Sequence, residues 1–156
     1  MSLTVGSLAP DFTLFSGKGQ TVTLSDLRGQ RVVLVFFPAA FTGVCTKEMC
    51  SFQSALAQFN DLNATVLGIS VDGVFANQAF RDQNGLEFTV LSDFQREAVT
   101  AYGIAVENFA GFTGYTAANR AVFVIDGQGK LAYVWVAPSL GQEPDYSEVQ
   151  AAVALA

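Results

Sequence analysis

The stretch "RVVLVFFPAAFTGVCTKEMC", residues 31–50, joins a strand pattern to a helix pattern. Residues 31–37 form a continuous β-branched and aromatic run, which is typical of a strand buried on both faces of a sheet. From residue 43 to residue 60, apolar side chains recur at spacings of three and four, which predicts a helix. These side chains are Met49, Phe52, Leu56 and Phe59. We therefore expect a central strand that leads, through a short loop, into a helix.

The rest of the chain extends this pattern on both sides. Further strands are predicted at residues 9–15, 20–24, 64–72, 88–93, 120–126 and 131–136, and further helices at 75–85, 96–103 and 146–156. Because strands and helices alternate, we expect a largely parallel sheet. The order of the elements is that of an α/β fold, a thioredoxin-like three-layer sandwich with an N-terminal β-hairpin extension. We expect one domain spanning residues 1–156.

Composition and charge exclude several classes of function. Eight basic against fourteen acidic side chains give a formal net charge of −6, and no basic cluster is present to neutralise a phosphate backbone. We therefore expect no nucleic acid partner. The first residues lack the charged and apolar regions of a signal peptide, and no stretch has the length of a membrane span. These features predict a soluble, cytoplasmic protein without a membrane partner.

The chain has two cysteines and no histidine. A Ser/His/Asp triad, a Cys/His dyad and the usual zinc ligand sets are therefore excluded. Cys45 falls in the first turn of the predicted helix, beyond the carboxyl end of the central strand, where open α/β sheets place their sites. The free backbone N–H groups of a helix start favour a thiolate there. The alternative is that Cys45 is a small buried apolar residue.

The loop and the helix start also carry a family motif. Pro38, Thr42 and Cys45 have the spacing of the peroxiredoxin signature, and phenylalanines surround it at positions 36, 37 and 41. The segments "APDFTL" (9–14), "LSD" (91–93) and "NRAVFVID" (119–126) resemble peroxiredoxin segments and occur in the same order. The resemblance therefore covers nearly the whole chain.

The resemblance implies specific roles for the three motif residues. Cys45 would be the peroxidatic cysteine, which attacks the terminal oxygen of a hydroperoxide and becomes a sulfenic acid. The Thr42 hydroxyl would hydrogen-bond both the thiolate and the peroxide, although threonine is also a common helix N-cap. Pro38 would shield the site and shape the turn. Its alternative role is to end the central strand.

Two charged residues complete the implied site. Arg120 stands at the start of the strand predicted at 120–126, which in a thioredoxin-like sheet lies antiparallel to the central strand. Arg120 can therefore reach Cys45 and stabilise negative charge on the thiolate and on the leaving oxygen. Glu48, one helical turn after Cys45, matches an acidic residue of many peroxiredoxins and would orient Arg120. The alternatives are a surface arginine and a solvated glutamate.

Cys50 lies five residues after Cys45 on the same predicted helix. Positions five apart are turned by about 140° and separated by roughly 8 to 9 Å between Cα atoms. A disulfide requires less than about 7 Å, so the helix must unwind before these cysteines can pair. The spacing resembles the bacterioferritin comigratory protein, or peroxiredoxin Q, group, in which Cys50 would resolve the sulfenic acid. Other segments resemble the alkyl hydroperoxide reductase E group, which includes one-cysteine enzymes. The alternative for Cys50 is an ordinary buried residue that faces the core.

A glycine-rich segment with aromatic side chains follows the third predicted helix, at 96–103. Phe109, Phe112 and Tyr115 lie in this 109–115 loop. They predict a homodimer interface that also uses Phe41, since peroxiredoxins often pair near the active site. The alternative is a loop that folds back over its own hydrophobic cluster.

The leading hypothesis is a thiol-dependent peroxidase for hydrogen peroxide and organic hydroperoxides, recycled by a thioredoxin-like protein reductant. No cofactor and no metal are implied. One alternative is a one-cysteine peroxiredoxin that uses an external thiol. Another is a general disulfide oxidoreductase, although that activity normally uses C-x-x-C, which is lacking here. A third is a redox-sensing module without turnover.

Overall fold

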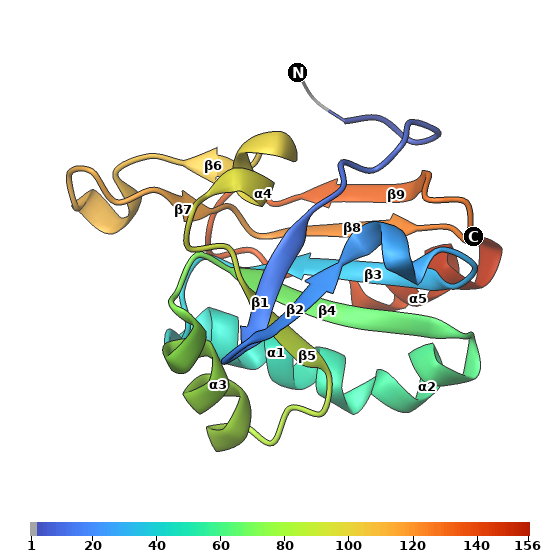
Figure 1. Ribbon diagram of the computed structural model, residues 1–156, viewed down its shortest axis with the longest axis horizontal. Coiled ribbons are helices and arrows are strands. Elements are labelled where there is room, and N and C mark those ends of the chain that lie inside the picture. Colours follow the sequence, from blue (N-terminus) through green and yellow to red (C-terminus); the bar gives the residue numbers. More distant parts are fainter. Residues whose placement is uncertain (1–2) are drawn as a thin grey trace.

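A computed structural model describes residues 3–156. In this part of the chain, seven strands form one large sheet, two short strands pair apart from it, and helices pack around the large sheet (Figure 1). The strands of the large sheet are β1 (Thr13–Gly17), β2 (Gln20–Thr23), β3 (Arg31–Phe36), β4 (Ala64–Ser70), β5 (Thr89–Ser92), β8 (Ala121–Ile125) and β9 (Leu131–Val136). The short strands β6 (Ala105–Val106) and β7 (Ala117–Ala118) pair separately. The predicted thioredoxin-like α/β architecture is confirmed.

The large sheet has the strand order β2-β1-β5-β4-β3-β8-β9. Only β3 with β4 and β4 with β5 are parallel, whereas the other four pairs are antiparallel. The expectation of a largely parallel sheet is therefore wrong. The alternation of strands and helices covers only the middle of the chain. Short connections make the pairs β1–β2 and β8–β9 antiparallel hairpins. The pairs β1–β5 and β3–β8, which join distant segments, are antiparallel as well.

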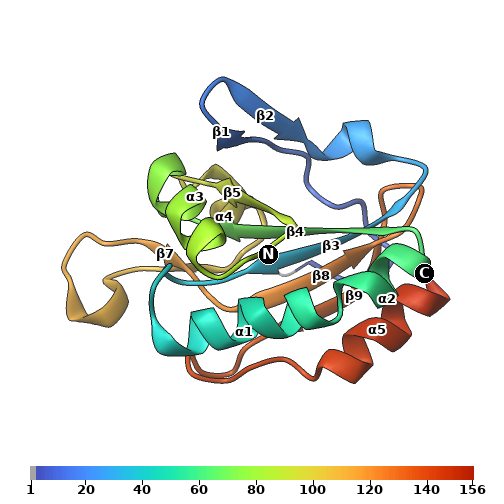
Figure 2. The same ribbon diagram turned by 90° about the horizontal axis from the view of Figure 1, so that it is seen from below.

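Helices cover both faces of this sheet. They are α1 (Gly43–Ser54), α2 (Leu56–Asp61), α3 (Val74–Gln83), α4 (Glu97–Ala101) and α5 (Tyr146–Leu155), with short 3-10 turns at Leu24–Leu27 and Phe109–Gly111. Figure 2 shows α1 and α2 following one another along one face, with α5 beside them, and Phe52 of α1 packs edge to face on Tyr146 of α5. Among the described residues, no helix is both long and apolar enough to cross a membrane.

The helix predicted over residues 43–60 is broken at Ala55. Its backbone has φ −93° and ψ 0°, and its N–H donates to the carbonyls of both Ser51 and Phe52. This tightening of the last turn separates α1 from α2. The apolar spacing remains regular across the break, so Phe52 and Phe59 still stack at 6.0 Å between ring centroids. The apolar spacing therefore indicates that both helices bury the same face. It does not indicate that they form one continuous helix.

The central strand β3 is buried on both faces, as its apolar run predicts. Val33 and Val35 face the cluster formed with α1, α2 and α5, whereas Leu34 and Phe36 face the cluster that contains α4. In the antiparallel pair of β3 and β8, Phe36 lies opposite Ala121. The carboxyl end of β3 and the amino end of β8 therefore meet at the same edge of the sheet. This edge carries the start of α1.

Candidate active site

The loop from β3 to α1 is held by hydrogen bonds to the carboxyl end of β4. The N–H of Phe37 donates to Ile69 O at 3.0 Å, and the N–H of Ala40 donates to Asp72 Oδ2 at 2.8 Å. Phe41 adopts φ 66°, a left-handed conformation that turns the chain just before α1 begins at Gly43. The loop therefore starts the helix directly above the end of β3.

Cys45 lies in the first turn of α1 and is almost completely buried, with 1% of its surface exposed. Nη1 of Arg120 donates to Cys45 Sγ at 3.3 Å and to Glu48 Oε1 at 2.9 Å. The guanidinium is also fixed from its other side, because Nε donates to Leu140 O at 3.1 Å. One cation thus joins two acidic groups that lie one helical turn apart.

Burial dominates the electrostatics of this trio. Glu48 has no exposed surface, and burial raises the pKa of its carboxyl from 4.5 to about 8, although Arg120 acts in the opposite direction. Burial alone would lower the pKa of Arg120, but Glu48 and Cys45 together raise it, so the guanidinium stays charged. Glu48 Oε2 has no hydrogen-bond partner among the described residues.

Thr42 occupies the N-cap position of α1 without making the usual cap bond. Its hydroxyl donates to Ala39 O at 2.8 Å, within the loop. Its carbonyl accepts from the N–H of Thr46 at 2.9 Å, which is the first bond of the helix. Thr42 is therefore the N-cap residue, as the alternative expected, but its side chain makes no cap hydrogen bond and points back to the loop. Thr42 and Pro38 both line the opening above Cys45.

A cavity of about 260 Å³ opens onto the sulfur of Cys45. Its lining combines the loop and helix start with two distant segments and consists of Pro38, Thr42, Gly43, Val44, Cys45, Phe109, Arg120, Leu140 and Gly141. The sequence analysis missed Leu140 and Gly141. Leu140 contributes a backbone carbonyl to Arg120, and a main-chain contact leaves no signal in the residue type. Asp72 was also missed, but its position directly after β4, at the edge that carries Cys45, was a readable signal.

Cys50 has a different environment on the same helix. It is half-buried, and its Sγ lies 4.0 Å from Asn84 Oδ1, at the end of α3. Both cysteines are free thiols in this structure. Because both lie within the continuous helix α1, they cannot pair until its turns unwind.

The aromatic residues of the predicted interface divide into two groups. Phe109 and Tyr115 pack edge to face at 5.6 Å between ring centroids, and both pack against the core of their own chain. Phe41 and Phe112 instead remain 52% and 64% exposed. The 109–115 loop thus folds partly over its own cluster and leaves two rings at the surface.

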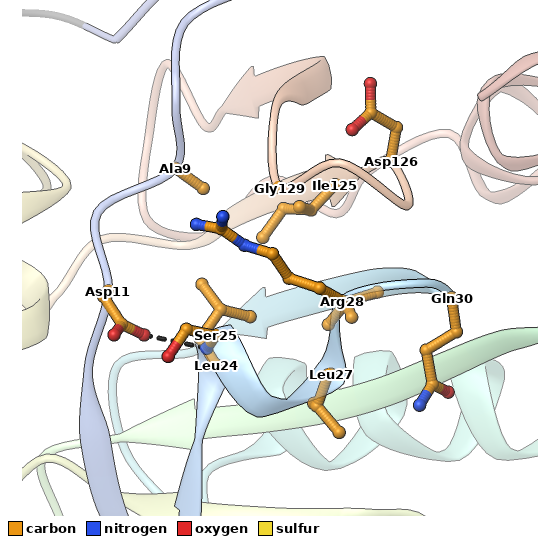
Figure 3. A pocket seen from close by; sticks show the side chains of 11 residues that line it. Ala9, Asp11, Leu24, Ser25, Leu27, Arg28, Gln30, Ile125, Asp126 and Gly129 are labelled. Carbon is orange, nitrogen blue, oxygen red and sulfur yellow. Dashed lines mark hydrogen bonds between the residues drawn. The ribbon is translucent and has the colours of Figure 1, made fainter.

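A second pocket lies at the other end of β3 and carries no thiol (Figure 3). The side chain of Arg28 extends across it toward Gly129, and Asp11 accepts a hydrogen bond from the N–H of Ser25 at 2.9 Å. The carboxylate of Asp126 accepts from the backbone N–H groups of Gln128 and Lys130 at the β8–β9 turn. These polar groups stabilise the local turns. We therefore identify the cavity above Cys45 as the candidate active site.

Comparison with known proteins gives a consistent result. The model of the AhpC/TSA family matches residues 5–134. Peroxiredoxin Bcp of Bacillus subtilis is 33% identical over 137 residues, which cover 86% of this chain and 86% of that protein. Peroxiredoxin Bcp of Escherichia coli is 35% identical over 134 residues, 85% of each chain.

Solved structures agree with these sequence relatives. A peroxiredoxin-like protein from Aquifex aeolicus superposes with a TM-score of 0.87 at 30% identity, over 98% of this chain and 87% of that chain. Peroxidoxin BcpB from Mycobacterium tuberculosis superposes with a TM-score of 0.83 at 30% identity, over 96% of this chain and 95% of that chain.

Proposed function

The chain belongs to the AhpC/TSA family, the peroxiredoxins of the Bcp and peroxiredoxin Q group, and is a thiol-dependent peroxidase; on this premise we propose that Cys45 is its peroxidatic cysteine. The observation that carries the proposal is the hydrogen bond from Arg120 Nη1 to Cys45 Sγ at 3.3 Å inside a buried site. A fixed cation and a helix start both favour the thiolate, which is the nucleophilic form of cysteine.

In the proposed reaction, the Cys45 thiolate attacks the terminal oxygen of a hydroperoxide. The S–O bond forms, the O–O bond breaks, and the sulfur becomes a sulfenic acid while the other oxygen leaves as water or an alcohol. Arg120 stabilises the charge that builds on the leaving oxygen. Thr42 would turn its hydroxyl from Ala39 O to the peroxide, and Pro38 would shield the sulfur from water.

We assign Cys50 as the resolving cysteine. Its thiol attacks the sulfenic acid after the first turns of α1 unwind, and the Cys45–Cys50 disulfide that forms releases water. A thioredoxin-like protein then reduces this disulfide to two thiols. The partial exposure of Cys50 supports this role, because a cysteine locked in the core could not move to meet Cys45.

The cavity above Cys45 supports organic hydroperoxides as substrates beside hydrogen peroxide. Phe109, Leu140 and Val44 present apolar side chains around the opening. The variant Phe109→Ala should lower the oxidation rate with cumene hydroperoxide several-fold and leave the rate with hydrogen peroxide within about twofold. Equal losses with both peroxides would contradict a role in substrate choice.

We propose that a second copy of the chain covers the exposed rings of Phe41 and Phe112. Light scattering over a range of protein concentrations would test this interface. A dimer mass that falls to the monomer mass in Phe41→Asp supports it. A monomer mass at every concentration would rule it out.

The deciding experiment mixes the reduced protein with one equivalent of hydrogen peroxide in a stopped-flow instrument. Trp135 packs against the cluster that contains Cys45, so its emission should report the oxidation. We expect a rate orders of magnitude above that of free cysteine, which Cys45→Ser abolishes. Sustained peroxide consumption with a thioredoxin system distinguishes an enzyme from a redox-sensing module, and a rate equal to that of free cysteine would refute the assignment of Cys45.

A further inference from the structure

The buried site contains two acids and one cation. Cys45, Glu48 and Arg120 are each at most 3% exposed. The other charged or titratable groups that face Glu48 come from the segment before α5 and from α5 itself. Glu143 accepts from the Tyr146 hydroxyl at 2.6 Å and pairs with the exposed Lys47 at 3.2 Å.

These neighbours supply no second cation to the site. The charge of Lys47 is already paired with Glu143 at the surface, and Glu143 itself acts against ionisation of Glu48. If Cys45 and Glu48 were both ionised, the buried trio would carry a net negative charge. An uncompensated buried charge is costly, so one of the two acids keeps its proton.

The geometry indicates which acid holds this proton. Cys45 is the third residue of α1 and lies beside the free N–H groups of its first turn. Glu48 lies one turn deeper, where the favourable effect of the helix end on negative charge has fallen off. Oε2 of Glu48 also has no donor to stabilise an ionised carboxylate. The negative charge therefore belongs on Cys45 and the proton on Glu48.

We propose that Glu48 stores the proton of the Cys45 thiol in the reduced enzyme and delivers it to the leaving oxygen of the peroxide. The proposal rests on the assignment of Cys45 as the peroxidatic cysteine. It gives Glu48 a task beyond orienting Arg120. The raised pKa of Glu48, about 8, is consistent with a carboxyl that is protonated near neutral pH.

The reaction then balances inside the site. Before the reaction the trio consists of a thiolate, a guanidinium and a protonated carboxyl, which together are neutral. The thiolate forms a bond to the terminal oxygen of the peroxide, the O–O bond breaks, and the leaving oxygen takes the proton of Glu48. The products are a sulfenic acid, water or an alcohol, and a Glu48 carboxylate paired with Arg120. The buried net charge is zero at both ends.

Infrared difference spectroscopy tests this transfer directly. The sample is the full chain carrying Cys50→Ser, so that the sulfenic acid persists, at pH 7 before and after one equivalent of hydrogen peroxide. We expect the stretching band of one protonated carboxyl to disappear on oxidation. The same band should be absent from Cys45→Ser without any peroxide, because Glu48 can then ionise against Arg120.

Two variants assign the band. Glu48→Gln should abolish the difference signal and slow oxidation by hydrogen peroxide about tenfold or more, since proton transfer to the leaving oxygen is then lost. Glu143→Gln, the matched carboxyl at the rim, should keep the signal. An unchanged carboxyl region during complete oxidation of Cys45, or a signal that survives in Glu48→Gln, would overturn the proposal. Because thiol loss is recorded on the same samples, a Cys45 that does not oxidise at all would instead refute the proposed function.

Discussion

The two cysteines of this chain lie on one helix, but only one of them lies in an environment built for reaction. Cys45 is 1% exposed at the start of α1 and receives a hydrogen bond from Arg120. Cys50 lies deeper in the helix and is half-buried, with Asn84 Oδ1 at 4.0 Å as its polar neighbour. Because the two residues are chemically identical, we expect any difference in their reactivity to come from the helix end and from Arg120, which precedes β8.

The comparison also separates two requirements of a peroxidatic cycle. Attack on a peroxide favours a fixed, dry site, since fixed donors act most strongly away from water. Resolution requires a thiol that can move, because the intact helix keeps the two sulfurs apart. With the proposed roles of Cys45 and Cys50, neighbouring turns of α1 would meet these two requirements.

Removal of the Cys50 thiol should stop the cycle after its first step. In Cys50→Ser, peroxide should oxidise Cys45 at the wild-type rate, but no intramolecular disulfide can form. The sulfenic acid should then accumulate and react with dimedone, as measured by intact-protein mass spectrometry. Wild-type turnover of Cys50→Ser with a thioredoxin system would show that an external thiol resolves Cys45, as in a one-cysteine enzyme.

Removal of the Arg120 cation should abolish most of the expected difference in peroxide reactivity between Cys45 and Cys50. Arg120→Met should slow single-turnover oxidation of Cys45 by about 100-fold to 1,000-fold, the usual loss when a fixed donor to a developing negative charge is removed. Arg120→Lys keeps the charge but loses the fork that also reaches Leu140 O, so its rate should be intermediate. Circular dichroism would verify the fold of both variants. Rates close to that of the wild type in both would show that the helix end alone activates Cys45.

The buried carboxyl of Glu48 should make the free energy of unfolding depend on pH. Its pKa is raised from 4.5 to about 8 in the folded chain, so between these pH values the folded state holds a proton that the unfolded chain has released. The resulting stabilisation is fully present below pH 4.5 and is lost as pH rises toward 8, by at most about 1.4 kcal/mol per pH unit.

Urea unfolding at several pH values would measure this effect. The free energy of unfolding of the reduced protein should fall more between pH 5 and pH 8 in the wild type than in Glu48→Gln. Glu143→Gln serves as the control at the rim. Identical pH dependence in the wild type and in Glu48→Gln would mean that Glu48 is ionised in the folded protein throughout this range.

The smallest effect should follow from changing the surroundings of Cys50. Asn84→Ala removes a weak contact at 4.0 Å and a hydrogen bond from Asn84 Nδ2 to Phe80 O. The free energy of unfolding should fall by about 1 kcal/mol. Rapid-quench experiments should find an unchanged rate of Cys45 oxidation and a slightly faster appearance of the disulfide. A large loss in the rate of Cys45 oxidation would show that the surroundings of Cys50 affect Cys45. That result would contradict the separation of the two environments.

Local patterns were sufficient to predict the elements that form the site. The apolar run at 31–37 gives the buried strand, and the motif of Pro38, Thr42 and Cys45 gives the helix start beside it. The position of Arg120 followed from one antiparallel pairing, which the register of Phe36 with Ala121 realises. The number of antiparallel pairs was underestimated, because which strands pair depends on contacts between distant segments.

The order of the amino acids supplies the chemical groups: two thiols, no histidine, a helix start at Cys45 and an arginine before β8. Tertiary structure decided how these groups act. The burial of Glu48, the carbonyl of Leu140 on Arg120 and the apolar wall of Phe109 all join segments far apart in the chain. Hydrogen bonds and exclusion from water depend on distances of a few ångströms, and only the packed fold sets distances between residues more than 70 positions apart.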